Sequence, residues 1–255
     1  MSSPHHQPRR RRGMRILIGA AAVLLVLAAA LAIYLRPYPA GTKAEQAMAP
    51  SEEITVVMED GVLRFETTAE PAANFIFYPG GLVQPESYAV LARSLAEKGV
   101  NTYIVAMPLN LAVLDRDGAK RALPLLNPHG INIIGGHSLG GTMAAEYAKN
   151  STIDVQGIVF LASYPNSDLG GLNIPVLSIY GSQDGVLDLE RYTNSKSYMP
   201  DSFEEHVIEG GNHAQFGDYG LQKKDKGATI SDDEQIQETV GTIVDWIAAL
   251  HESGT

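Results

Sequence analysis

The sequence predicts an α/β domain with a mostly parallel sheet flanked by helices, preceded by one N-terminal transmembrane helix. Three observations support this prediction: an uncharged apolar run at residues 16–35, alternating strand-like and helix-like segments from residue 54 onward, and a Gly-rich turn at residues 136–140. Strands that alternate with helices form parallel sheets, because each crossover returns the chain to the same edge. A chain of 255 residues accommodates one such domain and a short appendage.

The apolar run at residues 16–35 comprises 20 uncharged residues, enough for a helix to cross a hydrocarbon core of about 30 Å. Five arginines precede it at positions 9–12 and 15, whereas only Arg36 and Lys43 follow it closely. The positive-inside bias therefore predicts a signal anchor in the cell membrane. Residues 1–15 would be a cytoplasmic basic arm, residues 16–35 a single span, and the remainder would be extracytoplasmic.

A cleaved signal peptide is the alternative interpretation of this run. The apolar region of a signal peptide usually has only about 7–15 residues, which favours the anchor. Ala30-Leu31-Ala32 and Ala47-Met48-Ala49 both have the small residues of a cleavage site, and Pro50 disfavours the second.

The composition excludes several classes of protein. Residues 1–36 hold six arginines and no acidic residue, so the rest of the chain carries 13 basic and 29 acidic residues, a net charge of −16. Such a domain is not expected to bind nucleic acid or anionic lipid surfaces. The chain has no cysteine, which excludes disulfides, a thiol nucleophile, cysteine metal ligands and a lipidated cysteine.

Residues 36–53 contain three prolines, Gly41 and small polar residues, and we expect a linker there. The domain is expected over residues 54–251. It begins with two strand-like segments, residues 54–58 and 62–66, joined by Asp60-Gly61, a pair typical of hairpin turns. The first strands are therefore predicted to be antiparallel.

Strand-like and helix-like patterns then alternate along the chain. The expected strands are residues 74–78, 101–107, 131–134, 155–161, 175–180 and 203–208, and the expected helices are residues 85–98, the segment after Ser138, and residues 232–250. A looser segment occupies residues 109–126. This order predicts crossover connections and a sheet that is mostly parallel.

The turn Gly136-His137-Ser138-Leu139-Gly140 has the pattern of a nucleophile elbow. A side chain at Gly136 or Gly140 would collide with the crowded turn, and the turn exposes the Ser138 hydroxyl above the sheet. The pattern alone is common, but a β-branched strand precedes this one and a small-residue helix follows it, as the motif requires. The backbone N–H of Leu139 is then a candidate oxyanion donor.

A serine hydroxyl is a poor nucleophile near neutral pH, so Ser138 needs a histidine as base and an acid that orients the histidine. Asp184 follows the expected strand 175–180, and His213 lies in a Gly-rich loop after the expected strand 203–208. Loops at the carboxyl ends of parallel strands gather at one edge of the sheet. We therefore expect Ser138, Asp184 and His213 to form a catalytic triad.

Each partner has an alternative interpretation. Asp184 precedes Gly185, a pair that is common in ordinary turns, and Asp188 is a rival acid. The chain has six other histidines, but His213 alone combines the loop position with the chain order nucleophile, acid, histidine.

The second oxyanion donor is expected in the loop that follows strand 74–78, Pro79-Gly80-Gly81-Leu82-Val83. Two glycines allow the backbone to approach a substrate carbonyl closely. The sequence leaves Gly81 and Leu82 as alternatives. A donor that follows the glycine pair favours Leu82.

With these features in place, residues 54–251 resemble the α/β-hydrolase superfamily, and within it the small capless bacterial branch of dienelactone-hydrolase-like proteins (α/β-hydrolase fold-5). The resemblance rests on Phe77-Tyr78-Pro79-Gly80-Gly81, Tyr88 to Gly99, Met107-Pro108-Leu109-Asn110-Leu111-Ala112 and Gly135-Gly136-His137-Ser138-Leu139-Gly140-Gly141. In that superfamily a cap is usually inserted where this chain has the 13-residue connection 162–174. No large cap is expected.

The resemblance implies hydrolysis of a carboxylic ester or related acyl compound through an acyl-enzyme on Ser138, in the manner of a carboxylesterase (EC 3.1 class). Dienelactone hydrolases have a cysteine nucleophile, so their lactone substrate is not implied. No metal or organic cofactor is expected. The expected partners are a small-molecule ester and the membrane. An acyltransferase and a non-catalytic surface scaffold are the alternatives. Met107, Leu109, Asn110 and Leu111 fit either an apolar pocket or the core.

Overall fold

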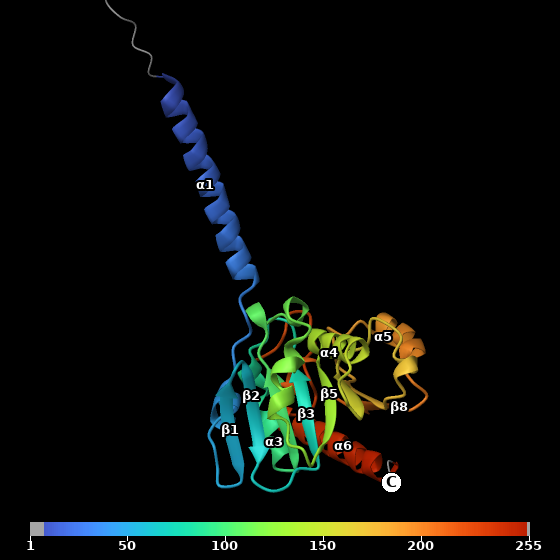
Figure 1. The fold of residues 1–255 in the computed structure, drawn as a ribbon. Coiled ribbons are helices and arrows are strands. Elements are labelled where there is room, and N and C mark those ends of the chain that lie inside the picture. Colours follow the sequence, from blue (N-terminus) through green and yellow to red (C-terminus); the bar gives the residue numbers. More distant parts are fainter. Residues whose placement is uncertain (1–7, 254–255) are drawn as a thin grey trace, which may run out of the picture. The chain divides into compact units, whose positions relative to one another are not determined.

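The computed structural model describes residues 8–253, which divide into an N-terminal unit that ends at Arg36 and a compact unit that begins at Pro37 (Figure 1). The N-terminal unit is the helix α1 (Pro8–Tyr34). Its segment Leu17–Tyr34 has a mean hydropathy of 2.6 and none of it is buried, so the helix is long and apolar enough to cross a membrane. A signal sequence has the same properties. Residues 1–7 of the expected cytoplasmic arm lie outside the described residues.

The compact unit is built on one eight-stranded sheet with the order β1-β2-β4-β3-β5-β6-β7-β8. The strands are β1 (Ile54–Glu59), β2 (Val62–Thr67), β3 (Ala73–Tyr78), β4 (Val100–Val105), β5 (Ile131–His137), β6 (Gly157–Leu161), β7 (Val176–Gly181) and β8 (Phe203–Ile208). Strand β2 pairs antiparallel with β1 and β4, and all other neighbouring strands are parallel. The predicted fold class is confirmed.

The hairpin that opens the domain has the predicted Asp60-Gly61 turn, with φ of 48° and 74° at the two residues. Positive φ at both central residues matches the right-handed twist of the flanking strands. The turn sets the register, in which Glu59 lies opposite Val62 and Ile54 opposite Thr67.

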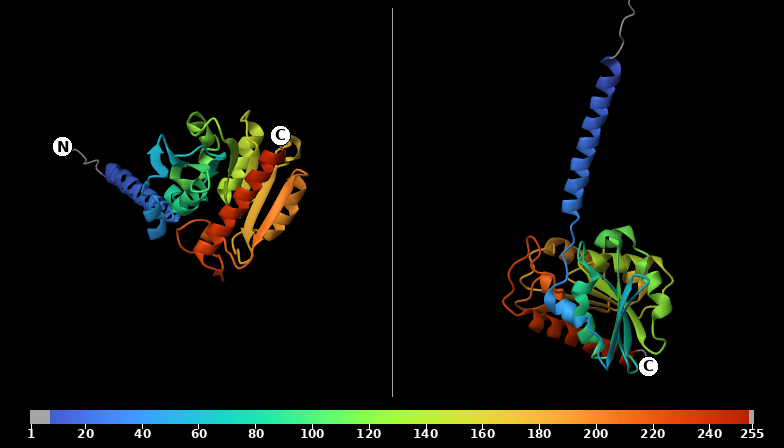
Figure 2. Two further views of the ribbon diagram at one scale, coloured as in Figure 1. Left: turned by 90° about the horizontal axis from the view of Figure 1, so that it is seen from below. Right: turned by 90° about the vertical axis from the view of Figure 1, so that its left-hand side faces the viewer.

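Helices cover both faces of the sheet. On one face α2 (Thr42–Ala47), α3 (Ala89–Ala96) and α6 (Asp232–Ser253) contribute to a single hydrophobic core. On the other face α4 (Leu139–Asn150) packs with the segment between β4 and β5. Figure 2 shows α6 running along the sheet. The sheet is therefore covered on both faces, and β3, β4 and β6 are buried along their whole length without alternation.

The connections between these strands and helices hold mostly short helical turns. They contain α5 (Leu189–Ser195), which the sequence did not indicate, and the 3₁₀ helices η1 (Pro85–Tyr88), η2 (Pro108–Asn110), η3 (Ala112–Leu114), η4 (Gly118–Arg121), η5 (Leu123–Leu125), η6 (Gly170–Leu172), η7 (Lys196–Tyr198) and η8 (Ala214–Phe216). Four of these turns make up the segment expected to be loose. The connection between β6 and β7 holds only η6, and no cap covers the sheet there.

The expectation of a linker at residues 36–53 is wrong for residues 37–53, because this segment folds with the domain. Ala44 and Ala47 of α2 are buried in the core, and the carbonyl of Ala47 accepts a hydrogen bond from Arg93 Nε at 2.8 Å. Asp218 Oδ2 accepts a hydrogen bond from the N–H of Ala44 at 2.8 Å. An alanine side chain buries little apolar area, so Ala44 and Ala47 did not stand out in the sequence as core residues.

Candidate active site

Ser138 lies between β5 and α4 with φ 51° and ψ −125°, a backbone conformation that a residue with a side chain rarely adopts. A Cβ added at Gly136 or Gly140 would overlap the carbonyl oxygen of Tyr78 at the end of β3. The neighbouring backbone therefore requires glycine at both positions, as predicted. The elbow is a strained turn held by the two glycines against the adjacent strand.

Two further side chains, which the sequence did not indicate, hold the elbow in place. Ser163, after β6, donates a hydrogen bond from its Oγ to the carbonyl of Ser138 at 2.6 Å. Thr142, in the first turn of α4, donates to the carbonyl of Tyr164 at 2.7 Å. Neither residue belongs to the five-residue elbow pattern from Gly136 to Gly140, so only the fold identifies these two contacts.

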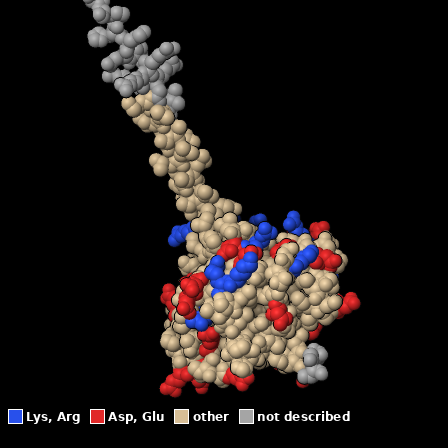
Figure 3. Space-filling model, viewed as in Figure 1, with Lys and Arg blue, Asp and Glu red and all other residues tan. Residues whose placement is uncertain are grey.

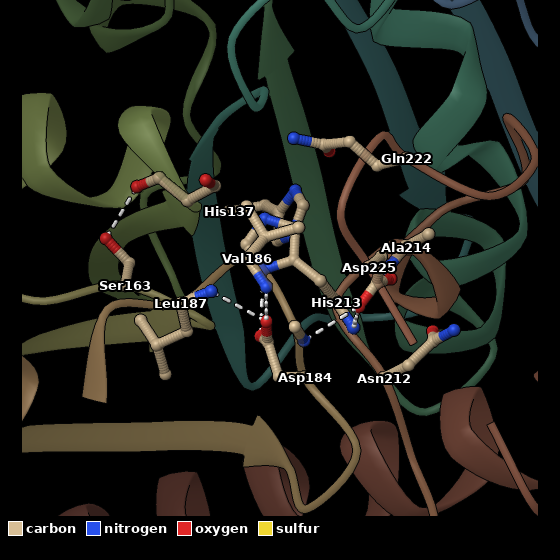
Figure 4. A network of polar contacts seen from close by, with 12 residues as sticks. His137, Ser163, Asp184, Val186, Leu187, Asn212, His213, Ala214, Gln222 and Asp225 are labelled. Atoms are coloured by element: carbon tan, nitrogen blue, oxygen red, sulfur yellow. Dashed lines mark hydrogen bonds and ion pairs between the residues drawn. The ribbon is translucent and has the colours of Figure 1, made fainter. Parts of the chain in front are cut away.

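Asp184 and His213 lie in contact at the carboxyl ends of β7 and β8 (Figure 4). His213 Nδ1 lies 2.8 Å from Asp184 Oδ2, and each side chain is only 1% exposed. Asp184 Oδ1 accepts hydrogen bonds from the N–H groups of Val186 at 2.8 Å and Leu187 at 2.7 Å. These bonds fix the carboxylate, so that its second oxygen faces the imidazole.

The other imidazole nitrogen, Nε2 of His213, is buried and has no hydrogen-bond partner within the described residues. Because Nδ1 is occupied by a carboxylate, the neutral ring carries its proton on Nδ1 and leaves Nε2 as an acceptor. A buried acceptor without a partner is uncommon in folded proteins. An acceptor of this kind is available to take a proton from a neighbouring group.

Ser138 and His213 line one hollow of about 260 Å³, together with Leu139, Thr142, Tyr164 and Leu187. The loops after β5, β7 and β8 thus meet at one edge of the sheet, as the sequence predicts, and the loop after β6 joins them. This hollow is not lined by the residues considered for an apolar pocket, Met107, Leu109, Asn110 and Leu111. Met107 is instead buried in the core. Asp188, the rival acid, also lines the hollow, but its Oδ1 caps α5 by accepting from Arg191 N at 3.0 Å.

The candidate oxyanion donors require one correction. The N–H of Leu139 is at the first position of α4, where no carbonyl of the helix can accept it. The N–H of Leu82 instead donates to the carbonyl of Asn110 at 2.7 Å, so it is not free to meet a substrate. In the described part of the chain no group accepts the N–H of Gly81, and a Cβ at Gly81 would lie 3.1 Å from Leu139 Cδ2. Gly81 therefore replaces Leu82 as the candidate.

A buried tyrosine supports the loop that carries Gly81. The hydroxyl of Tyr88 lies 2.9 Å from the N–H of Gly80, which donates to it, and 2.9 Å from His137 Nδ1. Both side chains are buried. Burial, assisted by the nearby His213, holds the pKa of His137 well below its ordinary value of 6.5. His137 is therefore neutral near pH 7 and links the elbow to the candidate oxyanion loop through Tyr88.

The lowered pKa of His137 predicts that the domain loses stability in mild acid. Below about pH 6.5 the unfolded chain binds a proton at this residue and the folded chain does not, so the free energy of unfolding falls as pH falls, by at most about 1.4 kcal/mol per pH unit. Urea unfolding at pH 7.5 and 5.5 measures this slope. The variant His137→Gln is expected to have a shallower slope than the wild type, whereas His129→Gln, at an exposed site, is not. Equal slopes for wild type and His137→Gln would contradict the assignment.

Asp225 connects the two loops that hold Asp184 and His213. Its Oδ1 accepts hydrogen bonds from the N–H groups of Gly185 at 3.0 Å and His213 at 3.3 Å, and its Oδ2 accepts from Ala214 N at 2.9 Å. This role could not be predicted, because Asp225 stands among three lysines, in a segment Lys223 to Lys226 that is typical of a solvated surface. Figure 4 shows Asp225 beside the His213 backbone.

Replacing Asp225 with asparagine is expected to lower kcat about tenfold with little change in KM, because an amide NH₂ would face backbone N–H groups and shift the two loops. Kinetics with a chromogenic ester measure the effect. The matched control is Asp201→Asn at an exposed turn, which should leave kcat unchanged. An Asp225→Asn variant with wild-type kcat would show that the loops hold their positions without this carboxylate.

A family model and several solved structures match this chain, and both indicate an α/β-hydrolase fold. The model of a family described as the alpha/beta hydrolase family matches residues 74–237. No curated protein sequence matches the chain.

In the described part of the chain no group of three or more His, Asp or Glu side chains is placed to hold a metal ion.

Several solved structures share the fold. A CIB-like hydrolase from Thermoplasma acidophilum is 16% identical with a TM-score of 0.55, over 77% of this chain and 100% of that one. Est1E from Butyrivibrio proteoclasticus is 13% identical with a TM-score of 0.55, over 79% and 100%. The HSL homologue EstE7 from a metagenome library is 16% identical with a TM-score of 0.58, over 82% and 90%. At these identities the likeness concerns the fold.

Proposed function

The chain belongs to the α/β-hydrolase family, and from this premise we propose that it is a serine hydrolase that cleaves carboxylic esters or related acyl compounds. The observation that carries the proposal is the unpartnered Nε2 of His213, on a ring that Asp184 holds from the other side, in the hollow that Ser138 also lines.

The proposed reaction has two halves. Ser138 Oγ attacks the acyl carbon while His213 Nε2 accepts the hydroxyl proton, and Asp184 stabilises the resulting imidazolium. The N–H groups of Leu139 and Gly81 donate to the oxyanion. His213 then gives the proton to the leaving alkoxide, which departs as an alcohol. Water attacks the acyl-enzyme in the same way and releases the carboxylic acid and free Ser138.

We further propose that α1 anchors the domain in the cell membrane as a single span, with the hydrolase domain extracytoplasmic. The length and hydropathy of Leu17–Tyr34 and the arginines before it support the anchor. Cleavage after Ala49 would remove α2, whose Ala44 and Ala47 are buried in the domain, which argues against that cleavage site. The mass of the mature protein and its resistance to carbonate extraction test the anchor.

Reaction with a fluorophosphonate probe, together with hydrolysis of p-nitrophenyl acetate, tests the enzymatic proposal. The folded full-length protein in detergent is expected to react with the probe and to release p-nitrophenol, and heat-denatured protein is not. Folded protein that does neither would leave the scaffold as the better explanation. Addition of methanol distinguishes transfer from hydrolysis, because an acyltransferase would form the methyl ester.

A further inference from the structure

We propose that the edge of the domain at the carboxyl ends of the parallel strands docks on a lipid bilayer, and that the substrate is an amphiphilic ester whose tail remains in that bilayer. This inference rests on the proposed function, both the serine hydrolase and the membrane anchor. It names the surface of the domain that meets the lipid and the chemical class of the substrate.

The first observation is where the chain enters the domain. The N–H of Tyr38 donates to the carbonyl of Leu82 at 2.7 Å, and the carbonyl of Tyr38 accepts from Gln84 N at 3.1 Å. Leu82 directly follows the candidate oxyanion donor Gly81. The attachment point of the domain is therefore part of the active-site edge.

The second observation is the length of chain before that point. Only Leu35, Arg36 and Pro37 separate the end of α1 at Tyr34 from Tyr38. An extended residue adds at most about 3.6 Å. Whatever direction α1 takes, a membrane that holds this helix keeps the Tyr38 edge of the domain close to the lipid headgroups.

The third observation is a set of exposed apolar side chains on the same edge, Leu109, Val113, Leu114 and Leu221, which are 61%, 47%, 54% and 61% exposed. The first three belong to the turns around Asn110, whose carbonyl accepts from Leu82 N. Leu221 follows Tyr219, whose ring centroid lies 5.8 Å from that of Tyr38. Large apolar side chains gathered at one place mark a surface that meets a partner or a membrane.

The charges on the domain support the same orientation. Arg116, Lys223 and Lys224 on this edge are exposed and have no ion-pair partner within the described residues, and the N–H of Lys223 lies 3.5 Å from Tyr38 Oη. The opposite edge, where the parallel strands begin, carries exposed Glu70 and Asp154, and the lower edge in Figure 3 shows acidic side chains. Cations suit lipid phosphates, and the acidic edge is repelled from them.

A docked edge determines which esters reach Ser138. The domain carries a net charge of −16, so docking has to come from the apolar side chains and does not require anionic lipid. An ester with a long tail is concentrated in the bilayer, and only its carbonyl has to rise to the hollow beside Ser138. Water then completes the reaction and the fatty acid stays in the lipid.

The absence of cysteine from the chain allows a direct test. Full-length protein with one introduced cysteine, Leu114→Cys or Leu221→Cys, is labelled with an environment-sensitive dye and reconstituted in phosphatidylcholine vesicles that contain nitroxide-labelled phosphatidylcholine. Ala69→Cys, at an exposed site near the beginning of β3, is the control. Dyes at residues 114 and 221 are expected to be blue-shifted and quenched, and the dye at residue 69 is not.

A dye at residue 114 as unquenched as the dye at residue 69 would overturn the docking proposal. Failure of the hydrolase proposal is a separate outcome, because it appears as a folded wild type that does not react with fluorophosphonate. Protein that reacts with the probe and shows an unquenched dye would refute the docking surface alone.

Activity provides the second test. The double variant Leu114→Asp, Leu221→Asp in vesicles is expected to hydrolyse bilayer-partitioned p-nitrophenyl laurate about tenfold more slowly than the wild type. Its rate on soluble p-nitrophenyl acetate is expected to be unchanged. The matched control is Tyr198→Asp, an exposed apolar position before β8, which should affect neither rate. Equal rates of the double variant and wild type on the laurate would contradict the substrate class.

Discussion

Replacing Ser138 with alanine is expected to abolish reaction with a fluorophosphonate and to lower kcat for ester hydrolysis by about 10⁴-fold or more. The substitution removes the oxygen that attacks the acyl carbon and leaves the backbone donors in place. Residual activity would come only from water held near His213. Active-site labelling and initial rates with p-nitrophenyl acetate measure the two effects.

The matched control is Ser163→Ala, because Ser163 places a second serine hydroxyl in the same hollow. This variant loses one hydrogen bond to the Ser138 carbonyl but should still react with the probe. Both variants should keep the wild-type circular dichroism spectrum. If Ser138→Ala reacts with the probe and Ser163→Ala does not, the nucleophile has been misassigned.

Replacing Asp184 with asparagine is expected to lower kcat about 10⁴-fold without unfolding the domain. The Asn carbonyl would keep accepting from the N–H groups of Val186 and Leu187, which turns the NH₂ group toward His213 Nδ1. Nδ1 then has to accept, and the ring proton moves to Nε2. The imidazole is held in place but can no longer take the proton of Ser138. Steady-state kinetics, with thermal unfolding to confirm the fold, measure this result.

Asp188→Asn is the control, since Asp188 is the nearby carboxylate that the sequence also permits as the acid. It caps α5, and its replacement is expected to cost about 1 kcal/mol of stability or less, with kcat within a factor of a few of the wild type. A larger loss of kcat in Asp188→Asn than in Asp184→Asn would reverse the assignment of the acid.

The positions of the strands along the chain and the elbow were predictable because their signals are local. Each buried strand reads as a short apolar run, and the two glycines around Ser138 reflect contacts with the adjacent strand that any elbow of this kind makes. Asp184 and His213 could be placed because each follows a strand whose carboxyl end faces the same edge. The distance between their side chains could not be predicted, but parallel strands leave few alternatives for it.

The parts that were missed depend on contacts between residues far apart in the chain. Leu82 was favoured over Gly81 from a turn pattern, whereas the observed turn places Leu82 at φ 60° and commits its N–H to Asn110. The sequence of a turn does not show which of its N–H groups lacks a hydrogen bond, because the acceptor can belong to another segment. Similarly, Arg93 and Asp218 hold α2 in place through hydrogen bonds to its backbone. Asp225 is one charge among lysines in the sequence, and only the fold places it where it accepts a hydrogen bond from the N–H of His213.

The hollow beside Ser138, at about 260 Å³, holds roughly nine water molecules at about 30 Å³ each. A substituent next to the ester carbonyl must share that room with the attacking serine, but a methylene far down a linear chain lies beyond it. Branching at the carbon adjacent to the carbonyl should therefore limit turnover more severely than lengthening the chain does. Branching at the carbon adjacent to the carbonyl, and not the length of the acyl chain, would then define which acids this hydrolase releases.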